Sequence, residues 1–143
     1  MKINLKFYRG SLLIAAALLV AVAVLIAVGI IPPVKTDTFP QATPERAVPA
    51  FWVNVVFTFV VAVVLGVIGF RTTGRSRWST IVLWSLGLLT LLLAFALNDA
   101  ALAYRGHGPA LRTATILLHF CSVADLVAAL VILSVALFLP KQA

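Results

Sequence analysis

SLLIAAALLVAVAVLIAVGII, residues 11–31, contains no charged side chain and a single hydroxyl group, on Ser11. A helix of this length rises roughly 30 Å, which is the thickness of the hydrocarbon core of a bilayer. Two further segments, 47–70 and 78–98, are also long and uncharged, and the interval between Arg112 and Lys141 contains one charge, Asp125. The sequence therefore predicts an all-α integral membrane protein, a four-helix bundle.

The composition of the whole chain agrees with this prediction. Hydrophobic residues make up 63% of the 143 residues and charged residues 10%, whereas about a quarter of the residues of soluble domains are charged. We predict one transmembrane domain over residues 1–143. Its helices are expected near 11–31, 47–70, 78–104 and 111–139, with a proline-rich outer loop at 32–46.

The first helix has an alternative interpretation as a cleaved signal peptide, because Lys2, Lys6 and Arg9 precede it. Its apolar run exceeds the roughly 7–15 residues of a signal-peptide core, which favours a spanning helix. Since the segment carries no polar side chain after Ser11, we expect it to be the most lipid-exposed of the four helices.

Two prolines are expected to begin helices. Thr43, Pro44 and Glu45 resemble an N-cap, a first-turn proline and an acidic first turn, which predicts a short interfacial helix before the second span. Pro109 is expected to open the last helix after a tight turn at 105–108, so that residues of the third and last helices face each other when their numbers sum to about 215.

The basic residues are distributed unevenly between the two ends of a four-span arrangement. One end has no acidic residue, and the other end has Asp37, Glu45 and Asp99. The basic residues of the first end are Lys2, Lys6, Arg9, Arg71, Arg75, Arg77 and Lys141; those of the second are Lys35, Arg46, Arg105 and Arg112. Because basic loops stay in the cytoplasm, we predict both termini inside. The net charge of +7 is then a topology feature, and no aromatic-interleaved basic patch points to nucleic acid.

Polar residues within the predicted spans gather in the outer half and at the midplane. They are Asn54, Thr58, Thr90, Asn98, Asp99, Thr115, His119, Ser122 and Asp125. At about 100° per residue, the four on the last helix cover roughly 120° of its surface. We therefore expect a single polar column inside the bundle, descending from the outer surface to Asp125.

Asp125 has no basic side chain at its own depth, so we expect its neutral form, donating a hydrogen bond to Thr90 or Thr58. Three roles stay open for it: a structural residue, a proton or cation site, or a partner for a cation from another subunit or ligand. Three also stay open for His119: a structural histidine, an axial ligand of a haem or pigment, or a proton relay with Asp99 or Asp125. We read Cys121 as a small buried apolar residue.

The sequences RTTGRSRW at 71–78 and LHFCSVADL at 118–126 accompany an architecture that resembles uncharacterised small four-span bacterial membrane proteins of the DoxX-like type. The resemblance implies a bacterial cytoplasmic membrane and carries over no site residue. No HExxH, GxSxG, Walker A or CxxC motif is present, so neither catalysis nor a metal site is expected.

We therefore expect a non-catalytic membrane protein that acts by association, as an accessory subunit of a larger complex, as a homo-oligomer or as a binding module for a hydrophobic ligand. Two alternatives remain: a small proton-coupled carrier that uses Asp125 and His119, and a haem-, quinone- or pigment-binding subunit that uses His119.

Overall fold

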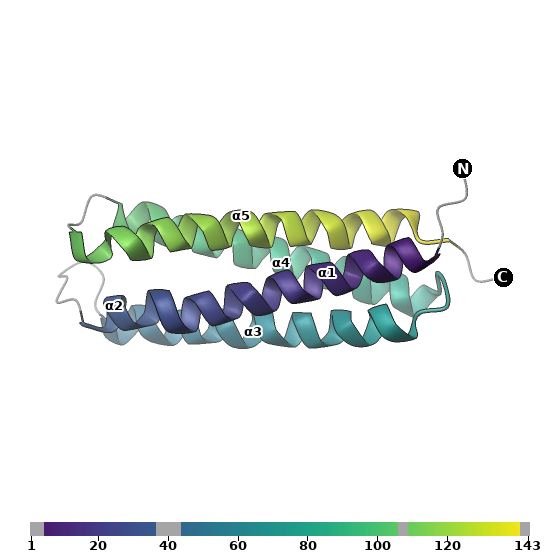
Figure 1. The fold of residues 1–143 in the computed structure, drawn as a ribbon, viewed down its shortest axis with the longest axis horizontal. Coiled ribbons are helices and arrows are strands. Elements are labelled where there is room, and N and C mark those ends of the chain that lie inside the picture. The colour runs from purple at the N-terminus through teal and green to yellow at the C-terminus, as the bar shows by residue number, and fades with distance from the viewer. Residues whose placement is uncertain (1–4, 37–43, 106–108, 141–143) are drawn as a thin grey trace.

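Four long helices run side by side in the computed structural model, which describes residues 5–36, 44–105 and 109–140 (Figure 1). All four are long and apolar enough to cross a membrane. The chain is thus all-helical, with the composition of a multi-pass membrane protein. One end of the bundle, which we call the basic end, holds the starts of α1 (Leu5–Leu25) and α4 (Arg77–Tyr104) and the ends of α3 (Pro44–Arg71) and α5 (Pro109–Phe138). The other end is called the distal end.

The first span is one continuous helix built from three segments: α1 (Leu5–Leu25), a π-helical turn η1 (Ile26–Ile30) and α2 (Ile31–Thr36). It continues past the predicted boundary at Pro32. Proline rings clash with the carbonyl four residues earlier, and here those carbonyls belong to residues 28 and 29, inside the π turn. The wider turn gives the helix a way to accommodate Pro32 and Pro33 without ending.

α3 (Pro44–Arg71) begins at Pro44, the residue predicted for the first turn. Thr43, the predicted N-cap, lies outside the described residues. The expected separate interfacial helix is instead the start of α3, which continues through Pro49.

α4 (Arg77–Tyr104) begins at a capping box. The Ser76 hydroxyl accepts a hydrogen bond from the backbone N–H of Ser79 at 3.1 Å, and the Ser79 hydroxyl accepts one from the backbone N–H of Ser76 at 2.8 Å. α5 (Pro109–Phe138) begins at Pro109, as the sequence predicts.

α1 occupies a central position in the bundle, where it packs against both α3 and α5. α5 makes its most extensive contact with α4, whereas α3 and α4 touch little. In the most apolar stretch of each span, 44% of the residues are buried in the first helix and 33% in α3. The expectation that the first helix is the most lipid-exposed is therefore wrong. Its alanines and leucines serve as packing surface for two neighbours, and this role needs no polar side chain.

The buried core consists of two apolar clusters stacked along the bundle. One, toward the basic end, includes Leu12, Leu65 and Ile132. The other, toward the distal end, includes Ile26 and Leu118. Between them lies a thin layer of buried polar side chains.

Candidate functional site

The polar layer is formed by Thr58 of α3, Thr90 of α4 and Asp125 of α5, each with 0% of its surface exposed. Asn54 lies one helical turn from Thr58 and is also buried. On each helix the layer separates residues of the distal cluster from residues of the basic-end cluster. Three helices therefore direct polar side chains into the interior at one level, as the sequence indicates for these positions.

The hydrogen bonds within this layer differ from those expected. The Thr58 hydroxyl donates to Oδ1 of Asn54 at 3.1 Å, and the Thr90 hydroxyl donates to the Leu86 carbonyl at 2.8 Å. Neither carboxyl oxygen of Asp125 has a hydrogen-bond partner among the described residues. The expected bond from Asp125 to Thr90 or Thr58 is thus absent among the described residues, and each threonine donates its proton within its own helix.

A second group of polar residues lines the contact between α4 and α5. The Ser122 hydroxyl donates to the Ala94 carbonyl at 2.9 Å, which confirms the predicted register in which facing residue numbers sum to about 215. Asn98 and Thr115 are half-buried on the same contact, and the Thr115 hydroxyl donates to the Leu111 carbonyl at 2.8 Å. We call this group, Asn98, Thr115 and Ser122, the α4–α5 seam.

His119 and Asp99 are exposed on the outside of the bundle. His119 precedes Asp125 by six residues, which at about 100° per residue rotates it by roughly 120° away from the interior. The single interior column predicted from the sequence is therefore wrong. The polar residues separate into the buried layer, the seam and two outward-facing side chains, and Asp125 does not share an environment with His119.

In the described part of the chain, no three His, Cys, Asp or Glu side chains lie close enough together to hold a metal ion. Cys121 is buried beside the polar layer, in the distal cluster. His107 lies outside the described residues.

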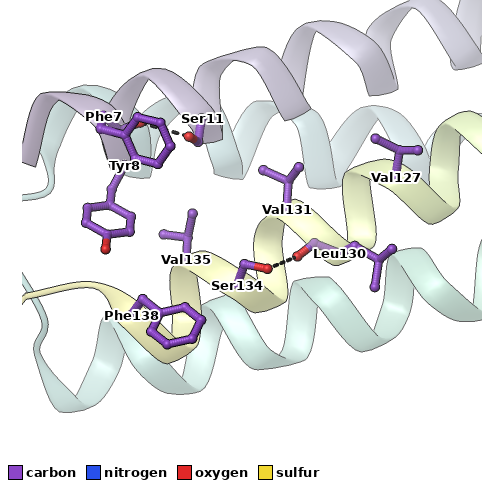
Figure 2. Close-up of a pocket in the computed structure, with 9 residues that line it drawn as sticks. All are labelled: Phe7, Tyr8, Ser11, Val127, Leu130, Val131, Ser134, Val135 and Phe138. Carbon is purple, nitrogen blue, oxygen red and sulfur yellow. Dashed lines mark hydrogen bonds between the residues drawn. The ribbon is translucent and has the colours of Figure 1, made fainter. Parts of the chain in front are cut away.

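Sequence reasoning missed a groove of about 500 Å³ between α1 and α5 at the basic end. Its lining includes Phe7, Tyr8 and Ser11 from α1 and Val131, Ser134 and Phe138 from α5, whose side chains lie around the same space (Figure 2). The Ser11 and Ser134 hydroxyls donate to Phe7 and Leu130 carbonyls of their own helices, at 2.8 and 2.7 Å. The groove is therefore almost entirely apolar. Both linings are ordinary apolar sequence, so only the packing of the two helices reveals it.

A smaller groove of about 320 Å³ separates α1 from α3. Val20 and Val24 of α1 face Val56 and Phe59 of α3 across it. No polar side chain is among its lining residues.

Hydrogen bonds from two arginines join different segments at the basic end, one from a side chain and one from the backbone. The Arg9 guanidinium donates to the carbonyls of Gly69 and Phe70 at the C-terminus of α3, the former at 2.9 Å. The backbone N–H of Arg75 donates to the Pro140 carbonyl at 2.7 Å and so joins the α3–α4 loop to the segment after α5. A cation at a helix C-terminus is favoured, because the last carbonyls there lack helical partners.

No family model matches this chain, and comparisons with curated proteins and with solved structures return no match.

Proposed function

We propose that this protein is a non-catalytic multi-pass protein of the bacterial cytoplasmic membrane that acts by association with another membrane subunit or a second copy of itself. The observation that supports it is the exposed position of His119, beside the half-buried polar groups of the seam.

The exposed position of His119 matters because this residue lies within the hydrocarbon core of a bilayer that is centred on α5. It lies ten residues after the start of α5 at Pro109, about 15 Å along the helix axis. α5 is about 45 Å long and the hydrocarbon core about 30 Å thick, so a centred helix places His119 roughly 7 Å inside the core. An imidazole facing lipid at that depth is unfavourable, whereas polar contact with another helix satisfies it.

Site-specific photocrosslinking in native membranes tests this proposal. A photoreactive residue at position 119 is expected to give a discrete crosslinked product, a homodimer or a complex with one other protein. The matched control is position 60 on α3, where Val60 is also exposed but has no polar neighbourhood. Absence of a product from 119, together with a monomeric mass in native detergent solution, would contradict the proposal.

The haem, quinone or pigment alternative keeps His119 as a ligand, now at an interface between subunits. An absorption spectrum of the purified protein distinguishes it from simple association. A Soret or pigment band that disappears in His119→Ala supports cofactor binding, and aromatic absorption alone counts against haem and pigment.

The proton-coupled carrier has less support. His119 and Asp125 face different environments, and apolar clusters lie on both sides of the Asp125 layer. Uptake by vesicles with and without a pH gradient, compared between wild type and Asp125→Asn, tests it directly.

A further inference from the structure

The α1–α5 groove has a length that matches one leaflet of a bilayer. It extends along α5 from Phe138, at the basic end, to Val127, and so stops two residues short of the buried Asp125. These twelve residues of helix span about 16 Å, and half of the hydrocarbon core measures about 15 Å. On an α5 centred in the bilayer, Phe138 lies roughly 7 Å outside the hydrocarbon core and Val127 roughly 5 Å short of the midplane, so the groove runs from the membrane interface into one leaflet.

The groove opens on the outside of the bundle. Phe7 and Phe138 on its rim are 61% and 67% exposed. Its volume of about 500 Å³ lies within the range of roughly 300–1,000 Å³ found for small-molecule sites. Since both serine hydroxyls in it are engaged within their own helices, its surface suits a flexible hydrocarbon chain.

Basic residues lie close in the sequence to the segments that form the groove at the basic end. Lys6 immediately precedes Phe7, and Arg75 is bonded through its backbone to Pro140, two residues after Phe138. The sequence contains no acidic residue at positions 1–36, 46–98 or 126–143, which include all the segments at this end. Arg9 is turned away, since its guanidinium binds carbonyls of α3. An anion arriving with the hydrocarbon chain meets a basic surface with no competing Asp or Glu side chain.

We propose that the α1–α5 groove binds one acyl chain of an anionic phospholipid, whose phosphate lies beside Lys6 and Arg75. The proposal rests on the chain being a membrane protein, and it does not need the partner proposed at the α4–α5 seam. Its failure and the failure of the association proposal are therefore separate results.

Native mass spectrometry of the delipidated protein tests the proposal, with phosphatidylglycerol and phosphatidylcholine of identical acyl chains as probes. We expect one phosphatidylglycerol to be retained with a preference of about 25-fold, since each of the two basic side chains contributes about a fivefold gain near a membrane surface. Val131→Phe combined with Ser134→Phe fills the groove and is expected to abolish retention of both lipids. The matched control, Val56→Phe in the α1–α3 groove, is expected to retain phosphatidylglycerol as wild type does.

The charge at the mouth is tested separately. Lys6→Gln with Arg75→Gln changes two exposed side chains, and we expect it to leave folding intact and to remove the preference for phosphatidylglycerol. Arg105→Gln with Arg112→Gln removes the same charge at the distal end and is expected to leave the preference unchanged. Equal retention of both lipids by wild type, or undiminished preference in the Lys6 and Arg75 variant, would overturn the proposal. Lipid retention by a folded Val131 and Ser134 variant would overturn it as well.

Discussion

Asp125 lies fully buried between two apolar clusters, and neither of its oxygens has a hydrogen-bond partner among the described residues. The Thr58 and Thr90 hydroxyls donate elsewhere, so they offer lone pairs and no proton to this carboxyl group. A neutral carboxyl can donate to such lone pairs, whereas an ionised one would stay unsatisfied.

We therefore expect Asp125→Asn to insert and fold like wild type, within about 1 kcal/mol, because the amide keeps the shape and the donor. Asp125→Lys is expected to fail, since a cation at the centre of a spanning helix costs about 2.5–3.5 kcal/mol. Thermal unfolding in detergent measures both variants. The premise fails if infrared spectra show, at neutral pH, an ionised carboxylate band that is lost in Asp125→Asn.

A second single residue, Gly87, affects how closely α4 and α5 pack, because it has no side chain. A Cβ at this position would lie 2.5 and 2.7 Å from Cδ2 and Cγ of Leu133, so α4 and α5 approach closely only because it is glycine. Gly87→Ala is expected to destabilise the bundle by about 1–3 kcal/mol through overpacking. Gly66→Ala on α3 is the control, because open space surrounds a Cβ there and its unfolding temperature should not fall. Equal stability of the two variants would contradict this account.

At the scale of elements, α3 depends on α1 for the termination of its last turn. Arg9→Met removes the donors to the Gly69 and Phe70 carbonyls and is expected to lower stability by about 1–3 kcal/mol, the range for losing a charge-assisted hydrogen bond. Arg71→Met removes an equal charge from the same helix end, but Arg71 is exposed, so we expect a change within about 0.5 kcal/mol. Chemical unfolding of both variants in detergent makes the comparison. Matching losses would mean that charge alone, rather than the bonds of Arg9, stabilises this end.

At the scale of the whole molecule, the distribution of charge predicts the orientation. The basic end holds the α3–α4 loop with Arg71, Arg75 and Arg77, and the acidic residues lie elsewhere in the sequence. Reporter fusions after Arg75 and at the C-terminus are expected to report the cytoplasm, and fusions within 35–46 the exterior. A cytoplasmic report from 35–46 would reverse the orientation and place the proposed lipid site in the other leaflet.

The sequence by itself indicated four long apolar helices, because the cost of an unpaired backbone or a charge in hydrocarbon acts on every residue. It also indicated Thr58, Thr90 and Asp125 as buried polar positions, since such side chains avoid lipid. The helix start at Pro109 and the register of the α4–α5 hairpin also followed from local geometry.

Only the tertiary structure decided which face of each helix turns inward. In a bilayer, lipid is as apolar as a leucine-rich core, so hydrophobic periodicity does not distinguish the two. For this reason α1, which has no polar residue after Ser11, gave no hint of its central position. His119 was misplaced because its helix face borders the interior, and a rotation of roughly 120° from Asp125 carries it outside. The α1–α5 groove arises from how two apolar surfaces pack at the basic end, and neither surface differs in sequence from one that packs closely.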